Sequence, residues 1–187
     1  MSKLVILSGP SGAGKTTIVN SLLQNEAFNL SFSISATSRK QRDGEENGRE
    51  YHFLSVDEFK SRIEEDRFLE WEEVYKNQYY GTLKNDVSRL LSQEKNVIFD
   101  IDVMGGLNVK RHYNDDAITI FIAPPSLEVL EERLKGRNTE DDAQLKKRLT
   151  KARMEMHYAR KFQHTITNED LDKAIDETTK LVADFLA

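Results

Sequence analysis

The segment from Gly9 to Thr16 matches the pattern G-x-x-x-x-G-K-[ST] at every position. This pattern is typical of loops that bind nucleoside triphosphates, because glycines let backbone N–H groups approach a phosphate where a side chain would clash. Lys15 supplies a mobile positive charge for the β- and γ-phosphates, and the hydroxyl of Thr16 is suited to Mg²⁺. A glycine-rich turn with an incidental lysine is the alternative. The expected triphosphate-binding residues are Gly9, Pro10, Ser11, Gly12, Ala13, Gly14, Lys15 and Thr16.

A carboxylate at the end of a predicted strand is the candidate partner for that metal ion. Asp100 directly follows the apolar run Val97-Ile98-Phe99. An aspartate at a strand end is often only a turn former, but beside a phosphate-binding loop it can organise Mg²⁺ or its bound waters. The expected metal site is therefore Thr16 together with Asp100, the latter through water.

A second phosphate site is indicated by Arg39 and Arg42, which lie three residues apart among hydroxyl side chains. Arginine presents a planar fork of donors that matches phosphate oxygens. Tyr51 and Tyr80 add hydroxyl groups at loop-like positions, and Glu70 is a carboxylate embedded in apolar sequence. A solvated basic loop is the alternative interpretation of the two arginines.

The elements around these residues alternate between strand and helix. Apolar runs at Lys3–Ser8, Asn96–Ile101 and Ile118–Ala123 predict buried strands, with a weaker candidate at Gln163–Thr167. Helical spacing follows the phosphate loop over Lys15–Gln24. Further helices are expected after the capping residues Ser55, Ser126 and Thr139 with Asp142, and a last helix is expected after Asn168. The alternation predicts an α/β fold with a parallel sheet covered on both faces. Residues 31–80 and 135–148 interrupt it and are expected to be excursions from the core.

Composition restricts the class of protein further. The chain has 187 residues, of which 38% are hydrophobic and 32% charged, as expected for one globular core. The absence of cysteine excludes disulfides and thiolate metal sites. The net charge of −5 argues against general nucleic-acid binding, and no apolar run approaches the roughly 20 residues of a membrane span. No export signal is detected, so a cytoplasmic location is expected, and the choice between monomer and homo-oligomer stays open.

The motifs taken together resemble the guanylate kinase family, over a span from Lys3 to about Leu186. The matching pieces, in order, are Gly9–Thr16, Ser33-Ile-Ser-Ala-Thr-Ser-Arg39 with Arg42, Gly48-Arg-Glu-Tyr51, Phe68-Leu-Glu-Trp71, Tyr79-Tyr-Gly-Thr82, Asp100-Ile-Asp102, Ile122-Ala-Pro-Pro125, Leu134-Lys-Gly-Arg137 and Asn168-Glu-Asp-Leu171. The resemblance implies a P-loop NTPase fold, a three-layer α/β/α arrangement within a single domain of residues 1–187. Its parts would be a core of about 1–30, 83–125 and 150–187, a monophosphate-binding insertion of about 31–82, and a lid of about 126–149.

The resemblance also assigns roles to individual residues. The guanine pocket would be lined by Ser35, Glu70, Thr82 and Asp102, and the GMP phosphate held by Arg39, Arg42, Tyr51 and Tyr80. The catalytic cations would be Lys15, Arg39, Arg137 and Arg148. ATP would additionally contact Arg133, Arg137 and Asn168. Two departures are visible: Met104 stands where the family usually has Gln, and Gln41 where it often has Pro.

The chemistry of guanine supports this assignment independently. Guanine presents two adjacent donors, N1–H and the N2 amino group, beside its O6 acceptor. A carboxylate such as Glu70 accepts from both donors, whereas adenine has an acceptor at N1 and would be rejected. The expected activity is therefore reversible transfer of the γ-phosphoryl of ATP to GMP or dGMP, with ATP as donor, Mg²⁺ as cofactor, and closure of the site around both substrates.

Three alternatives remain open. The first is a kinase for another monophosphate. The second is a regulatory GTPase, because Asp102-Val-Met-Gly105 fits D-x-x-G, although no N-K-x-D motif occurs in the chain. The third is a non-catalytic guanylate-kinase-like protein-interaction module. Such modules typically lose the lysine or arginines that are present here.

Overall fold

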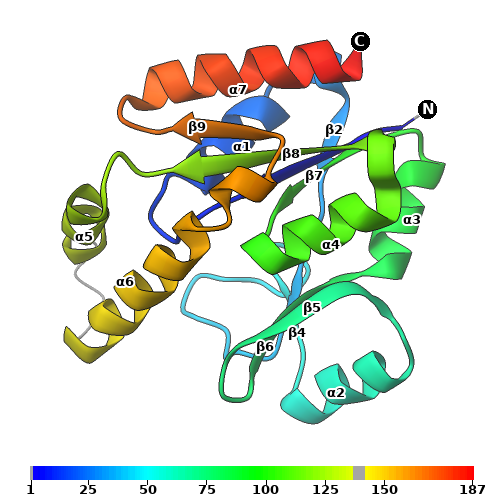
Figure 1. Cartoon of the computed structure of the whole chain (residues 1–187). Coiled ribbons are helices and arrows are strands. Elements are labelled where there is room, and N and C mark those ends of the chain that lie inside the picture. Colours follow the sequence, from blue (N-terminus) through cyan, green and yellow to red (C-terminus); the bar gives the residue numbers. More distant parts are fainter. Residues whose placement is uncertain (1, 137–141) are drawn as a thin grey trace.

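A parallel sheet forms the centre of the computed structural model, which describes residues 2–136 and 142–187. Its strand order is β2-β7-β1-β8-β9, and every neighbouring pair is parallel (Figure 1). The strands are β1 (Leu4–Ser8), β2 (Leu30–Phe32), β7 (Asn96–Asp100), β8 (Ala117–Ala123) and β9 (His164–Thr167). Buried strands of a parallel sheet are continuous apolar runs, which is why β1, β7 and β8 could be predicted from sequence. The weaker candidate corresponds to β9, and the three-residue, half-buried β2 is not among the predicted strands.

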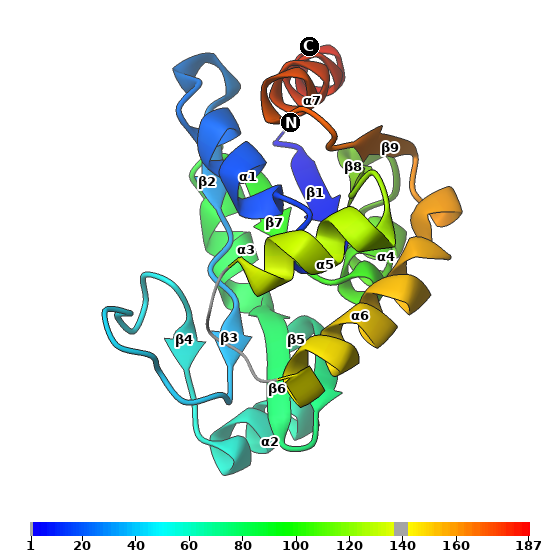
Figure 2. The same cartoon turned by 90° about the vertical axis from the view of Figure 1, so that its left-hand side faces the viewer.

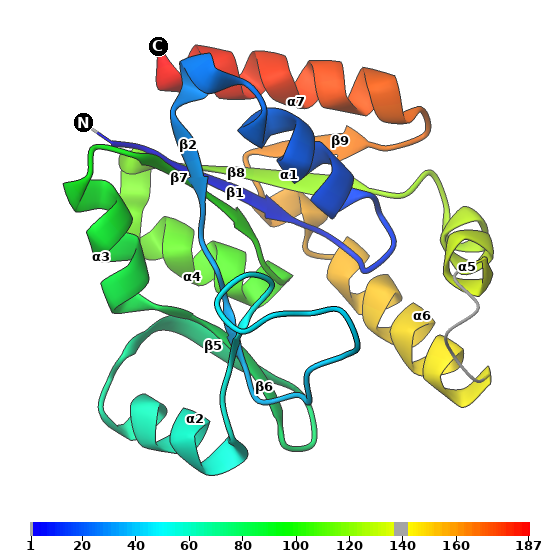
Figure 3. The same ribbon diagram turned by 180° about the vertical axis from the view of Figure 1, so that it is seen from behind.

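Helices cover both faces of this sheet. Val5 and Leu7 of β1 pack in one apolar cluster with residues of α1 (Lys15–Leu23) and α7 (Leu171–Leu186). Leu4 and Ile6 point the other way, toward α3 (Lys84–Ser92) and α4 (Val103–Tyr113). Successive strand residues face opposite sides, so one five-residue strand serves both layers. The result is the expected α/β/α sandwich, seen from the front in Figure 1 and from behind in Figure 3.

A second, smaller sheet lies below the central one, together with α2 (Figure 2). Its strand order is β4-β3-β6-β5, with β3 parallel to β4 and the other pairs antiparallel. The elements are β3 (Ala36–Thr37), β4 (His52–Phe53), α2 (Val56–Glu64), β5 (Phe68–Tyr75) and β6 (Gln78–Leu83). Phe59 of α2 is fully buried and stacks on Phe68 at 4.3 Å between ring centroids, which anchors the helix to its sheet.

Two further helices stand at the end of the molecule where the strands of the central sheet finish. They are α5 (Leu127–Lys135) and α6 (Asp142–Met156), which pack through Leu130, Leu134 and Ala152. Short 3₁₀ helices occupy Glu26–Phe28, Asn114–Asp116 and Ala159–Lys161. No helix in the described part of the chain is both long and apolar enough to cross a membrane.

The expected helix starts largely agree with the structure. Ser55 forms a complete capping box with Glu58, and Ser126 accepts a hydrogen bond from the backbone N–H of Val129. The last helix is capped by Asp170, two residues after Asn168. Thr139, the other expected cap, lies outside the described residues. Strand β2 pairs with β7 in the central sheet, so residues 30–32 lie across the expected start of the insertion at 31.

Candidate active site

At both ends of the loop between β1 and α1, a glycine lies very close to another part of the chain. A Cβ on Gly9 would lie 2.2 Å from the carbonyl oxygen of Ile122, and one on Gly14 would lie 2.2 Å from Nδ2 of Asn168. Both glycines have positive φ angles, 140° and 96°. Since α1 begins at Lys15, the backbone N–H groups at its N-terminus face the loop, which is the geometry of a phosphate-binding site.

Lys15, Thr16 and Asp100 come together at the ends of adjacent strands. The register pairs Leu7 with Asp100, which brings the carboxylate beside the loop that follows β1. The Thr16 hydroxyl donates to Asp100 Oδ2 over 2.9 Å, and Lys15 Nζ lies 3.8 Å from Asp100 Oδ1. Lys15 Nζ also donates to the carbonyl oxygen of Gly9 over 2.8 Å. The lysine is therefore directed back over its own loop.

Asn168 and Arg133 lie on the other side of the phosphate loop. Asn168 Nδ2 donates to the carbonyl oxygen of Ala13 over 2.7 Å, while its buried Oδ1 has no hydrogen-bond partner among the described residues. Arg133 Nη2 donates to the carbonyl oxygen of Asn168 over 2.9 Å. A cavity of about 310 Å³ opens here, lined by Gly12, Gly14, Thr17, Arg133, Asn168, Glu169 and Leu171. It is large enough to accept part of a nucleotide beside the loop.

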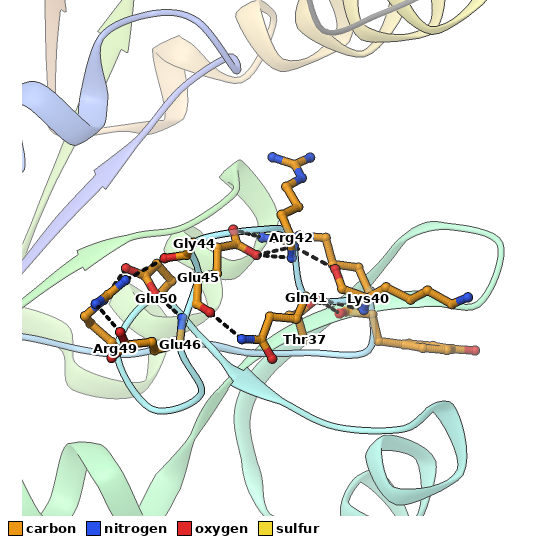
Figure 4. A network of polar contacts seen from close by, with 11 residues as sticks. Thr37, Lys40, Gln41, Arg42, Gly44, Glu45, Glu46, Arg49 and Glu50 are labelled. Atoms are coloured by element: carbon orange, nitrogen blue, oxygen red, sulfur yellow. Dashed lines mark hydrogen bonds and ion pairs between the residues drawn. The ribbon is translucent and has the colours of Figure 1, made fainter.

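Arg39 is fixed within the loop between β3 and β4. Its Nη1 and Nη2 donate to the two carboxylate oxygens of Glu45 over 2.8 and 2.6 Å. The guanidinium carbon also lies 5.1 Å from the ring centroid of Tyr51, which in turn contacts Tyr80 edge-on at 5.9 Å. Arg42 differs from Arg39: it is exposed, and its guanidinium points away from the loop network in Figure 4.

Glu70 lies in a buried pocket in the second sheet. It is 5% exposed, and its Oε1 accepts a hydrogen bond of 2.6 Å from the hydroxyl of the fully buried Thr82. Burial raises the pKa of Glu70 to about 8. Ser35, which is 8% exposed, belongs to the same sheet region.

The pocket is closed by the N-terminus of α4. Asp102 is the N-cap of this helix, and its Oδ1 accepts from the backbone N–H groups of Met104 and Gly105. A Cβ on Gly105 would lie 2.4 Å from Glu70 Oε2, so a larger residue there would displace the carboxyl group. The carbonyl oxygen of Asp102 accepts from the hydroxyl of Ser8, the residue before the phosphate loop, over 3.2 Å. One short segment thus connects the Glu70 pocket to the phosphate loop.

Helix α6 contacts both sides of the site. Arg148 donates from its guanidinium to the hydroxyl of Ser11 in the phosphate loop. Lys151, one turn further on, lies 3.9 Å from Glu72 Oε2 on β5 and 3.7 Å from Glu155 Oε1. Burial raises the pKa of both carboxyl groups. Arg137, a further expected cation, lies outside the described residues.

The structure therefore places the described members of the predicted set in two groups, one at the phosphate loop and one in the second sheet and its β3–β4 loop. Residues at the start of α4 and along α6 contact both groups. Sequence reasoning did not single out three groups of residues that shape these sites: Glu45, Gly105, and the set of Glu72, Lys151 and Glu155. Each of them contacts a partner from another turn or element, and a local sequence pattern does not report such contacts. The sequence did hint at Gly105, through its place in the D-x-x-G match, but the structure gives that aspartate the role of a helix cap.

The chain is a three-layer α/β protein with a P-loop after its first strand and a separate polar pocket in an inserted sheet. These features define its class, the P-loop nucleoside-monophosphate kinases. Comparison with known proteins gives the particular family. The family model described as guanylate kinase matches residues 1–185. The chain belongs to the guanylate kinase family, whose members transfer phosphate from ATP to GMP.

Individual relatives agree with the family model. The guanylate kinase of Porphyromonas gingivalis is 50% identical over 187 residues, which are 100% of each chain. That of Bacteroides thetaiotaomicron is 50% identical over 184 residues, covering 98% of this chain and 90% of the other. A crystal structure of the guanylate kinase from Anaplasma phagocytophilum superposes with a TM-score of 0.77 at 26% identity, covering 98% of this chain and 85% of the other. The expectation of a catalytic member is supported, and the interaction-module alternative gains no support.

Proposed function

We propose that this chain phosphorylates GMP with the γ-phosphoryl of ATP, using the Glu70 pocket for guanine and the Gly9–Thr16 loop for the ATP phosphates. The main support for the proposal is the segment from Asp102 to Gly105. Gly105 lies against the carboxyl group of Glu70, and the carbonyl oxygen of Asp102 accepts a hydrogen bond from Ser8. A single rigid segment between the two sites sets where the acceptor phosphate meets the donor phosphate, and positioning is most of what phosphoryl transfer requires of a protein.

For the acceptor, we propose that Glu70 accepts from N1–H and the N2 amino group of guanine, with Ser35, Thr82 and Asp102 completing the pocket. Its buried, low-dielectric setting makes an unpaired polar group costly, which favours guanine over adenine. Because the Thr82 hydroxyl already donates to Glu70, it has to turn to donate to O6. The GMP phosphate would be held by Arg39, Arg42, Tyr51 and Tyr80.

For the donor, we propose that Lys15 binds the β- and γ-phosphates and that Arg133, Arg148 and Asn168 complete the ATP site. The unpaired Oδ1 of Asn168 is an acceptor suited to the exocyclic amino group of adenine. Arg137 is proposed to join the catalytic cations on the resemblance alone. Subdomain limits of about 31–82 for the insertion and 126–149 for the lid remain part of the proposal.

Mg²⁺ fits the oxygen donors of this site. The Thr16 hydroxyl and the Asp100 carboxylate lie 2.9 Å apart at the loop, and both are hard ligands of the kind that Mg²⁺ prefers. Among the described residues no group of three or more His, Cys, Asp or Glu side chains could hold a metal. The ion would therefore be held by these two residues, with Asp100 acting through water, and by substrate phosphates, and it would neutralise charge on the transferring group.

The test is a coupled assay of ADP release with ATP and each nucleoside monophosphate in turn. We expect kcat/KM for GMP to exceed kcat/KM for AMP, CMP and UMP by at least about a thousandfold, because a pocket that hydrogen-bonds its substrate can discriminate to that degree. Glu70→Gln should reduce kcat/KM for GMP strongly while leaving the KM for ATP unchanged. Equal turnover with AMP, or unaltered GMP kinetics in the variant, would refute the guanine pocket.

A further inference from the structure

Glu45 uses both of its carboxylate oxygens to organise the loop that carries the two arginines. Its Oε1 accepts from Arg39 Nη2 over 2.6 Å, and its Oε2 accepts from Arg39 Nη1 and from the backbone N–H of Arg42, each over 2.8 Å. The side chains of Arg39 and Glu45 are only 10% and 17% exposed. Figure 4 shows Glu45 in the middle of this network, beside Gln41 and Arg42.

Besides Glu45, a backbone carbonyl oxygen and two aromatic rings restrict the guanidinium of Arg39. The carbonyl oxygen of Lys40 accepts a further hydrogen bond from Nη1 over 2.8 Å. The rings of Tyr51 and Phe53 lie 5.1 and 5.5 Å from the guanidinium carbon. Three acceptors and two rings leave this side chain little rotational freedom.

An inventory of donors shows which edge of Arg39 remains available. Guanidinium has five N–H groups in a rigid fork. Both N–H groups of Nη1 and one of Nη2 are engaged by Glu45 and Lys40. The two that remain, on Nε and Nη2, lie parallel along one edge of the fork. Such a pair of donors matches two oxygens of a phosphate.

The charges around this loop are compatible with anion binding. The hydrogen bond from Arg39 holds the pKa of Glu45 down at about 2, so the carboxylate stays ionised and balances the charge of Arg39. Arg42 is exposed, and its guanidinium pairs with no acidic group in the described part of the chain. Its backbone N–H is nevertheless fixed by Glu45. The acidic and basic side chains of residues 38–51 are equal in number, so the loop as a whole is neutral; Arg42 contributes a local exposed positive charge, while Arg39 supplies a preset pair of donors.

We propose that Glu45 is a positioning residue for the acceptor phosphate: it binds the Nη1–Nη2 edge of Arg39 so that the adjacent Nε–Nη2 edge is presented to the phosphate of GMP. This inference rests on the proposed function of Arg39. Pre-ordering removes the conformational entropy that a long side chain loses on binding, and it keeps the fork in the orientation needed for a bidentate contact. The competing view is that Glu45 merely occupies Arg39 and has to be displaced by phosphate.

The test replaces the carboxylate with an isosteric amide. We expect Glu45→Gln to raise the KM for GMP by about tenfold with little change in kcat or in the KM for ATP, because an interaction made equally in the ground and transition states is lost. Affinity for guanosine, which lacks the phosphate, should stay within about twofold of wild type. Glu46→Gln is the matched control in the same loop, since exposed Glu46 forms its ion pair with Arg49 and with no other charged group among the residues that the structure describes. A KM for GMP that is unchanged or lower in Glu45→Gln would overturn the proposal and favour the competing view.

A double-mutant cycle with Arg39→Ala separates positioning from general damage to the loop. If Glu45 acts through Arg39, then Glu45→Gln adds no further increase in KM once Arg39 is truncated. A further increase of about tenfold in that background would overturn the role through Arg39 and show that the carboxylate acts by another route, such as its contact with the backbone N–H of Arg42. Arg39→Ala alone tests the proposed function of Arg39. If this variant leaves the KM for GMP unchanged, the proposed phosphate site is wrong. If it raises the KM for GMP strongly while Glu45→Gln leaves it unchanged, only the positioning role of Glu45 is wrong.

Discussion

Thr82 donates its hydroxyl proton to Glu70 Oε1 over 2.6 Å, inside a pocket where Glu70 is 5% exposed and Thr82 is fully buried. Burial outweighs this hydrogen bond and raises the pKa of Glu70 to about 8, well above its ordinary value of 4.5. The free protein therefore carries this carboxyl group mostly in its protonated form at neutral pH. In the proposed guanine site the carboxylate is the form that accepts from two guanine donors, so on this proposal the pocket loses a proton when guanine binds.

The first prediction is that GMP binding at pH 7 releases close to one proton. Calorimetry in two buffers with different ionisation enthalpies measures this number directly. Affinity for GMP should weaken as the pH falls from 8 to 6, by up to about tenfold per unit below the pKa of Glu70. The phosphate of GMP titrates in the same range, so the informative quantity is the difference between wild type and Glu70→Gln. Equal proton release in both proteins would contradict the prediction.

The same group makes stability depend on pH. Because the folded-state pKa lies above the unfolded value, the folded chain holds the extra proton between about pH 4.5 and pH 8. The contribution of Glu70 to the free energy of unfolding is thus greatest below that window, falls as the pH rises through it, and is constant above it. Glu70→Gln should remove this slope, as urea unfolding at pH 6 and pH 8 would show.

The second prediction concerns Gly105. Alanine is ordinarily the better residue inside a helix, but a Cβ here would lie 2.4 Å from Glu70 Oε2. Gly105→Ala should push the carboxyl group out of place and lower kcat/KM for GMP by at least about tenfold, with the KM for ATP unchanged. Gly136→Ala is the matched control, because its Cβ would make only an ordinary contact at 3.5 Å with the carbonyl oxygen of Glu132. Identical kinetics for both variants would show that the close approach is unimportant.

The phosphate loop and the buried central strands β1, β7 and β8 could be predicted because their signals are local, whereas the short, half-buried β2 was missed. The Gly9–Thr16 pattern is contiguous, and the buried strands are unbroken apolar runs, so neither needs a distant partner to be recognised. The capping box at Ser55 and Glu58 is equally local, and the structure confirms it. The α/β/α arrangement then follows from the alternation of strands and helices.

The details of the site depend on contacts between distant residues, which no single-sequence pattern reports. Glu45 lies in a charged stretch where it looks like an ordinary surface residue, and its contacts with Arg39 form only when the loop folds back. Gly105 meets a strand residue 35 positions earlier, and Arg148 reaches a serine 137 positions away. Tertiary packing decides these contacts.

The third prediction separates phosphoryl transfer from acceptor binding. Lys15 Nζ is held by the carbonyl oxygens of Gly9 and Pro10 and lies 3.8 Å from Asp100, all outside the Glu70 pocket. Lys15→Met should lower kcat by about a thousandfold or more, because a charge aimed at the transferring phosphate is lost. The dissociation constant for GMP, measured without ATP, should stay within about twofold of wild type. A parallel loss of GMP binding would count against two separate sites.

The fourth prediction addresses Lys151, the cation between Glu72 on β5 and Glu155 on its own helix. The side chains of Lys151 and Glu72 are 29% and 32% exposed, so the pair itself contributes on the order of 0.5–1 kcal/mol. Lys151→Met leaves neighbouring carboxyl groups without their shared cation, and their mutual repulsion grows as they ionise. Since burial already raises both pKa values, the stability lost by the variant should be small at pH 6 and larger at pH 8.

Urea unfolding at the two pH values measures that difference, and Lys151→Met combined with Glu72→Gln provides the control. Removing one carboxylate from the cluster should recover most of the stability lost at pH 8, because the remaining acids then repel one another less. Kinetics add a second readout. Because α6 also carries Arg148 to Ser11 of the phosphate loop, weaker anchoring of the helix on β5 should lower kcat at pH 8, and the double variant should restore it in parallel with stability. A loss that is independent of pH, or one that the second substitution fails to relieve, would show that the lysine contributes through the packing of its stem and not through its charge.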